Sequence, residues 1–282
     1  MKLASFRVDG RPSYGLVKDG GIVDAGRRLG AAAPDLKSAI AGGLDRLVAL
    51  AGEAVDHSLD AVELAPVITN PDKILCVGIN YRTHQLETGR PLPEYPVIFT
   101  RFSNSQVGHG RPMLRPPESI KFDYEGELAV IIGTGGRRIA ADRALQHVAG
   151  YACYNDGSIR DWQRHSVQYT PGKNFESSGA FGPWMVTADE IADPSALTLE
   201  TRLNGQVMQH APISDLIFDV PSLIAYISTF TSLVPGDVIV TGTTGGVGAF
   251  RDPPVWMKAG DTVEIEISRI GILRNPIADE VV

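Results

Sequence analysis

Residues 122–133 read FDYEGELAVIIG, and both the fold and the candidate chemistry follow from this stretch. Asp123, Glu125 and Glu127 alternate at a period of two, so on a β-strand the three carboxylates would point to one face. The apolar, β-branched residues that come next predict a strand that enters a core. Because buried charges are tolerated when they are paired or bind a metal, we expect a cationic partner for these carboxylates.

Another carboxylate follows the predicted strand 150–154, which leads into Asn155 and Asp156. Two glutamates and an aspartate from a neighbouring strand would form an all-oxygen ligand set, which suits Mg²⁺ or Mn²⁺. The alternative interpretation places the first strand at a surface edge, with its carboxylates in water. The residues after Glu127 are too apolar for an edge strand, so the pattern favours a metal site. Its expected ligands are Glu125, Glu127 and Asp156.

Composition restricts the class of protein. The 282 residues suffice for one large domain or one domain with a small appendage, and 43% hydrophobic with 21% charged residues is typical of a globular chain. The 30 glycines and 19 prolines favour strands and turns. A formal net charge of −7 argues against nucleic acid and anionic membranes as partners. An anionic substrate would need local cations, and the candidates are Arg82, Arg101, Arg160 and Lys173.

The sequence also indicates the cellular compartment in which the protein resides. Residues 1–10 contain no apolar region of the signal-peptide type, and no run approaches the roughly 20 apolar residues that span a bilayer. The two cysteines, Cys76 and Cys153, each lie in an apolar run and fit buried thiols of a reducing compartment. We therefore expect a cytoplasmic protein with no membrane partner.

Two parts of the chain differ in pattern. Residues 1–24 predict three short strands separated by Asp-Gly turns, and residues 35–55 carry a helical stripe interrupted by Gly42-Gly43. A linker with two prolines follows, so we expect a small N-terminal α/β domain over 1–70 and a larger domain over 71–282. The larger domain is predicted to hold strands at 73–78, 96–101, 237–241 and 261–267, a hairpin around Asn204-Gly205 and an amphipathic helix over 220–233.

Three further features of the sequence could take part in catalysis or in substrate binding. His84 and Glu87 are three residues apart in a predicted helical turn, where a carboxylate would orient the imidazole and raise its basicity. A surface ion pair explains the same spacing equally well. Lys173 follows a Pro-Gly turn, and taken alone it fits an exposed loop lysine better than a functional one. Residues 242–248 form either a plain turn or a cradle for a substrate carboxylate.

In several motifs together, the sequence resembles the fumarylacetoacetate hydrolase family, in its short, prokaryotic-type branch of acylpyruvase-like and 2-hydroxyhepta-2,4-diene-1,7-dioate isomerase-like proteins. The resemblance covers roughly residues 71–277. The resemblance rests on these motifs: VGINY at 77–81 with His84 and Glu87, DYEGEL at 123–128, Asn155-Asp156, RDWQ at 160–163, Gly172-Lys173, Gly182-Pro183 and Thr241-Gly242-Thr243.

The resemblance implies an α+β, β-rich fold, a mixed β-roll or barrel with flanking helices, usually assembled as a homodimer. It implies Mg²⁺ or Mn²⁺ on Glu125, Glu127 and Asp156, with a water in place of the additional aspartate of the long eukaryotic-type members. His84 and Glu87 would form a catalytic dyad on a lid over residues 81–94. A small-molecule 2-keto acid substrate would contact side chains that include Arg82, Gln163, Lys173 and Thr243.

The chemistry that unites these features is cleavage of a C–C bond in an acylpyruvate-type 2,4-diketo acid. His84, held by Glu87, would activate water, Lys173 would stabilise the oxyanion, and the metal would act as a Lewis acid toward an enolate. The same enolate arises when an oxaloacetate-like acid loses CO₂ or in a 2-hydroxymuconate-type isomerisation, so the metal motif does not separate these reactions. A protein that only binds a keto acid would explain the carboxylates but not the dyad and Lys173.

Overall fold

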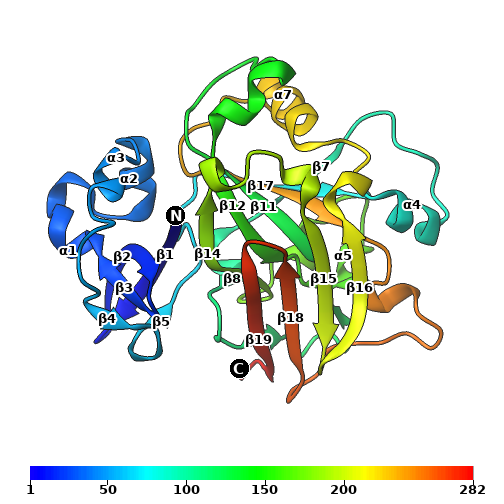
Figure 1. The fold of residues 1–282 in the computed structure, drawn as a ribbon. Helices are drawn as coiled ribbons and strands as arrows, with labels where there is room; N and C mark the ends of the chain where they lie inside the picture. Colours follow the sequence, from blue (N-terminus) through cyan, green and yellow to red (C-terminus); the bar gives the residue numbers. More distant parts are fainter. Residues whose placement is uncertain (282) are drawn as a thin grey trace.

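The chain folds around one large mixed sheet of twelve strands, described for residues 1–281 in a computed structural model (Figure 1). Two short strands lie off the main path, β5 (Glu63–Leu64) beside β1 and β8 (Gln106–Val107) beside β14. The order of the others has two free edges, so the sheet formed by the described residues is not closed into a barrel. From edge to edge they are β4 (His57–Ser58), β3 (Gly21–Asp24), β2 (Arg11–Lys18), β1 (Lys2–Val8), β14 (Gly179–Thr187), β12 (Val148–Asn155), β11 (Gly126–Ile132), β17 (Val238–Thr243), β6 (Ile74–Gly78) and β7 (Val97–Arg101).

A second sheet of five strands packs beside the first, and the α+β, β-rich fold class is thereby confirmed. The predicted hairpin is present, because Asn204 and Gly205 adopt the positive φ angles of 53° and 80° that a tight two-residue turn requires. The five strands are β16 (Gln206–Pro212), β15 (Thr198–Leu203), β18 (Thr262–Ile267), β19 (Gly271–Asp279) and β9 (Met113–Arg115), and a separate pair is formed by β10 (Phe122–Asp123) and β13 (Ser158–Ile159).

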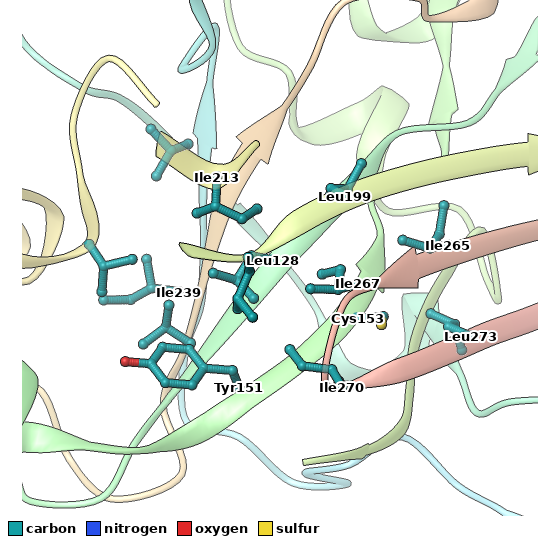
Figure 2. Packing of buried hydrophobic residues seen from close by; sticks show 14 of the residues in the cluster. Leu128, Tyr151, Cys153, Leu199, Ile213, Ile239, Ile265, Ile267, Ile270 and Leu273 are labelled. Carbon is teal, nitrogen blue, oxygen red and sulfur yellow. The ribbon is translucent and has the colours of Figure 1, made fainter. Parts of the chain in front are cut away.

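Strand β11 is buried along its whole length, which explains its continuous apolar sequence. On one face, Leu128 packs in a cluster with Leu199 and Ile265 of the second sheet (Figure 2). On the other face, Ala129 and Ile131 pack in a cluster that contains residues of the N-terminal part. The strand that leads away from the acidic motif is therefore a central support, and the edge-strand interpretation is wrong.

The N-terminal part shares both a sheet and a core with the remainder of the chain. Strand β1 pairs with β14 in antiparallel register, with Leu3 opposite Met185. The predicted division at residue 70 stays a prediction. The helical stripe over 35–55 is broken as expected at Gly42-Gly43, and the helices of this part are α1 (Ala25–Leu29), α2 (Leu36–Ala41) and α3 (Asp45–Val48).

Helix α7 (Val220–Phe230) confirms the predicted amphipathic helix, and Asp219 caps it by accepting a hydrogen bond from the backbone N–H of Ser222. Leu223 and Ile227 are buried as expected. Phe230, expected to point inward, is the last residue of the helix and is 55% exposed. No helix within residues 1–281 combines the length and the apolar character needed to cross a membrane.

Two long strands, β14 and β19, were not predicted from the sequence, and neither were the short strands β4, β5, β8, β9 and β13. Gly182 and Pro183 interrupt the pattern of β14, and both residue types are depleted in strands. Strand β19 keeps the strand period, with Leu273 and Ile277 buried, but Pro276 obscures it. Short 3₁₀ helices complete the described chain at Gly30–Ala32, Leu59–Ala61, Ser103–Ser105, Ala141–His147, Ala188–Glu190, Pro194–Ala196, Ile213–Asp215 and Gly248–Phe250.

Candidate active site

The candidate site lies where several strand ends meet in the large sheet. Glu125 directly precedes β11 and Asp156 directly follows β12. Because these strands are antiparallel neighbours, the start of one lies beside the end of the other, and the N–H of Asp156 donates to the carbonyl of Glu125 at 2.9 Å. On the other side of β11, Glu127 pairs with Thr243 at the end of β17. The sheet itself thus gathers the acidic residues.

The three expected metal ligands are brought together. Glu125, Glu127 and Asp156 are all buried, and each offers a carboxylate oxygen within 4.8 Å of those of the other two. Hard oxygen donors at such spacing suit a small divalent cation. The residues on which the sequence prediction rested therefore form one compact cluster.

Asp123 does not belong to this cluster, although the alternation placed it on the same face. The strand is interrupted between β10 and β11, which pair with different partners. The carboxylate of Asp123 accepts a hydrogen bond from Nε of Arg160 at 2.7 Å and from the backbone N–H groups of Gly248 at 2.8 Å and Ala249 at 2.9 Å. Asp123 therefore holds the loop after β17 and orients Arg160.

Cations surround the acidic cluster. Nζ of Lys173 lies 2.6 Å from Oε2 of Glu125 and 2.6 Å from Oδ2 of Asp156. Nη1 of Arg160 lies 2.6 Å from Oε1 of Glu125, and Nη1 of Arg101 lies 2.6 Å from Oδ1 of Asp156. Lys173 is 1% exposed, so its interpretation as an exposed loop residue, based on the turn alone, is wrong.

The burial of Lys173 depends on close packing of two short helices, α5 (Arg160–Gln163) and α6 (Thr170–Lys173). A Cβ atom on Gly172 would lie 2.3 Å from the backbone nitrogen of Gln163, so only glycine permits this approach. This packing holds α5, which carries the RDWQ motif, beside Lys173 at the end of α6.

Charge is distributed unevenly within the cluster. Burial opposes ionisation of Glu125, but Lys173 and Arg160 outweigh it and lower its pKa to about 2. Burial, together with Asp156 and Glu125, raises the pKa of Glu127 well above its usual value. Oε2 of Glu127 accepts the N–H of Gly242 at 2.5 Å, and no lysine or arginine within residues 1–281 forms an ion pair with it. A divalent cation would supply the charge that Glu127 lacks, and the donor set therefore fits one.

The dyad is formed on helix α4 (Arg82–Thr88). Nδ1 of His84 lies 2.9 Å from Oε2 of Glu87, and the other oxygen of Glu87 accepts the N–H of Gly246 at 2.9 Å. His84 is buried and lines the same cavity as Glu125 and Glu127. Its Nε2 has no hydrogen-bond partner among the described residues. His84 is therefore part of the cavity wall, with Glu87 as its partner outside the lining, and the alternative of a surface ion pair is wrong.

The cavity has a volume of about 230 Å³. Thr243 lines it and donates its hydroxyl to the carbonyl of Gly126 at 3.0 Å, and Gln163 accepts from Nη1 of Arg160 at 3.1 Å. Arg82 is exposed and is not among the lining residues, because it lies two positions before His84 and so on another side of the helix. The other lining side chains from the sequence analysis are His84, Glu125, Glu127, Arg160 and Lys173.

A family model described as "Fumarylacetoacetate (FAA) hydrolase C-terminal" matches residues 73–278. The chain belongs to the fumarylacetoacetate hydrolase family. The match begins just before β6 and ends within β19, so it includes every strand that positions the site and every residue of the acidic cluster. The resemblance read from the motifs is thereby confirmed.

Relatives within the fumarylacetoacetate hydrolase family differ in reaction. The chain is 45% identical over 216 residues to oxaloacetate tautomerase fahd2, mitochondrial, of Xenopus laevis, which covers 76% of this chain and 67% of the relative. It resembles the structure of 2-hydroxyhepta-2,4-diene-1,7-dioate isomerase from Mycobacterium marinum, with a TM-score of 0.78, 30% identity and 99% of each chain covered. It also resembles maleylpyruvate hydrolase from Sphingobium sp. SYK-6 in complex with manganese(II) ion and pyruvate, with a TM-score of 0.83, 28% identity and 100% of each chain covered.

Several lining residues of this fumarylacetoacetate hydrolase family member were not singled out from the sequence. Arg90 and Arg164 have no pattern that separates them from ordinary surface arginines, although residues 89–94 were expected to form part of a lid. Tyr169, just before α6, and Phe250, in the 3₁₀ helix Gly248–Phe250, reach the cavity from positions far apart in the chain. Only the three-dimensional arrangement identifies these four side chains as parts of the site.

Proposed function

We propose that this protein interconverts the enol and keto forms of a short 2-oxo dicarboxylic acid such as oxaloacetate. The observation that carries the proposal is the free Nε2 of His84, which shares one cavity with Glu125 and Glu127, two members of the buried acidic cluster. The 45% identity to an oxaloacetate tautomerase supports the choice of reaction. The hydrolysis favoured by the motif analysis becomes the second candidate.

The proposed cofactor is Mg²⁺ or Mn²⁺, held by Glu125, Glu127 and Asp156. When bound, a divalent cation supplies Lewis-acid chemistry, because it polarises the 2-oxo group and so acidifies the adjacent carbon. Lys173 and Arg160 keep Glu125 ionised, and Lys173 also forms an ion pair with Asp156. Because these side chains already form ion pairs with carboxylates, the bound divalent cation would supply the positive charge that favours a substrate carboxylate in the inner cavity.

His84 is the group proposed to move the proton. Because its Nδ1 faces Glu87, the neutral ring carries its proton there and presents an unprotonated Nε2 to the cavity. In the keto-to-enol direction, Nε2 takes a proton from the carbon next to the 2-oxo group and returns it to the oxygen. The reverse direction uses the same two transfers, and no atom is gained or lost. Glu87 stabilises the imidazolium that forms between them.

Cavity size favours a small substrate. A cavity of about 230 Å³ is smaller than the roughly 300–1,000 Å³ that is usual for drug-sized ligands. Tautomerisation also requires no second reactant, whereas hydrolysis requires a positioned water and room for the acyl group that leaves.

Hydrolysis of an acylpyruvate is retained as the second candidate because of the similarity to maleylpyruvate hydrolase. In that reaction Nε2 of His84 would take a proton from water, and Lys173 would stabilise the oxyanion. Decarboxylation of oxaloacetate would use the same carboxylates. These reactions differ in product, so one set of assays separates them.

The test uses the purified protein with Mg²⁺ and, separately, with Mn²⁺. Loss of ultraviolet absorbance by enol-oxaloacetate follows tautomerisation, released CO₂ follows decarboxylation, and pyruvate formed from acetylpyruvate follows hydrolysis. We expect fast loss of the enol, with slower release of CO₂ and of pyruvate. Rapid cleavage of acetylpyruvate with no acceleration of enol loss would overturn the proposal and favour hydrolysis.

A further inference from the structure

Two arginines at the mouth of the cavity differ from the cations inside it. Arg160 and Lys173 are buried and form ion pairs with Glu125. Arg90 and Arg164 line the same cavity but are exposed. Neither forms an ion pair with an aspartate or glutamate of the described chain. The mouth therefore carries positive charge that the protein itself does not neutralise.

Aromatic residues hold both of these guanidinium groups in place. Nη1 of Arg90 donates a hydrogen bond to the hydroxyl of Tyr169 at 2.8 Å. The ring of Tyr169 packs edge-on against Phe99, with ring centroids 5.5 Å apart. The guanidinium of Arg164 lies 6.0 Å from the ring centroid of Phe250, within reach of a cation–π interaction. Arg90 and Arg164 are thus positioned at the cavity without a carboxylate partner.

The planar guanidinium group binds a carboxylate with two parallel hydrogen bonds. A 2-oxo acid whose first carboxylate lies at the acidic cluster and its cation would point its other end toward the mouth. We propose that Arg90 and Arg164 bind the second carboxylate of a dicarboxylate ligand and so select 2-oxo diacids over 2-oxo monoacids. This inference deepens the proposed function, on which it rests for the 2-oxo acid class of the ligand.

Binding of two stable probes tests the inference without turnover. L-malate and L-lactate share a 2-hydroxy carboxylate, and only malate has a second carboxylate. Titration calorimetry with Mg²⁺ present should give at least about 10-fold tighter binding of malate to the natural protein. Arg90→Gln and Arg164→Gln should each weaken malate binding about 10-fold and leave lactate binding within about 2-fold.

Two additional variants sharpen the comparison. Arg143→Gln removes an exposed arginine that does not line the cavity, and it should leave both affinities unchanged. Tyr169→Phe keeps the charge of Arg90 but removes its hydrogen-bond partner, so it should weaken malate binding by less than Arg90→Gln does. Thermal unfolding of each variant shows whether the fold is retained.

The results that test the role of Arg90 and Arg164 can be distinguished from the results that test the proposed function. Equal binding of malate and lactate by the natural protein would overturn the inference. Equal weakening of both probes by Arg90→Gln and Arg164→Gln would overturn it too, because the arginines would then act on the shared group. If malate selectivity depends on these arginines but enol-oxaloacetate is not converted faster, the inference holds and the proposed function fails.

Discussion

Glu87 contacts His84 through one carboxylate oxygen and the loop after β17 through the other. Oε2 lies 2.9 Å from Nδ1 of His84, and Oε1 accepts the N–H of Gly246 at 2.9 Å. The contact therefore joins helix α4 to the loop after β17. Because Glu87 does not line the cavity, its effect on the reaction acts through the orientation of His84.

Glu87→Gln should lower kcat about 10- to 100-fold and change KM by less than about 2-fold, because an outer-shell partner orients the reacting group without touching substrate. Steady-state kinetics of enol-oxaloacetate loss give both constants. Glu94→Gln is the matched control, since Glu94 is exposed on the same segment. A KM that rises as much as kcat falls would show that Glu87 contributes to substrate binding instead.

Metal binding should depend on pH through Glu127. Its pKa is raised well above the usual value by burial and by its acidic neighbours, and a metal binds only the deprotonated carboxylate. Affinity for Mg²⁺ or Mn²⁺ should therefore increase as pH rises toward and through this raised pKa, with release of a proton. Calorimetry in buffers of different ionisation enthalpy measures that release.

Glu127→Gln should remove both the proton release and most of the metal affinity. The matched control is Glu118→Gln, because Glu118 is exposed near the same part of the chain. A natural protein whose metal affinity does not change between acidic and neutral pH would contradict the role assigned to Glu127.

Lys173 should stabilise the metal-free protein. Its ammonium group forms ion pairs with Glu125 and Asp156, and removal of one partner from a buried ion pair typically costs about 3–5 kcal/mol. Lys173→Met should lower the free energy of unfolding in chelator by about that amount, and saturating Mg²⁺ should restore part of it. Urea unfolding of Lys121→Met, where the lysine is exposed, provides the comparison. Equal stability of the two variants in chelator would contradict the assignment.

Gly172 should be intolerant of a side chain. A Cβ atom there would lie 2.3 Å from the backbone nitrogen of Gln163, so Gly172→Ala should destabilise the protein by about 1–3 kcal/mol and displace Lys173. Gly52→Ala is the control, because a Cβ atom at Gly52 would have no neighbouring atom within 4 Å, and its effect should stay within about 0.5 kcal/mol. Unfolding free energies of similar size for the two variants would argue against close packing of α5 and α6.

Much of the site could be predicted because its key residues follow local patterns. Glu125 directly precedes a strand and Glu127 lies at its start, before an apolar run that indicates burial, and Asp156 follows the next strand along the chain. Neighbouring antiparallel strands place such ends side by side. The spacing of His84 and Glu87 likewise fits one helical turn, and the structure keeps them 2.9 Å apart.

Other features depended on contacts that no local pattern encodes. Alternation placed Asp123 with the two glutamates, but the strand is interrupted there and Asp123 binds Arg160 instead. The sequence around Lys173 indicates an exposed residue, and only the approach of α5 and α6 buries it. Arg82 and Arg90 are equivalent in type, and only the course of the chain after α4 brings Arg90, not Arg82, to the cavity.

The measurement that tests the proposed chemistry most directly is exchange of hydrogen for deuterium at carbon 3 of oxaloacetate in D₂O, followed by NMR with Mg²⁺ present. The natural protein and His84→Asn are compared at equal concentration, after thermal unfolding has shown that both are folded. We expect the natural protein to accelerate exchange and His84→Asn to lose about 10²- to 10⁴-fold of that rate, as is typical for a general base. Exchange by His84→Asn within about 2-fold of the natural rate would contradict the role of His84 as the proton-transfer group.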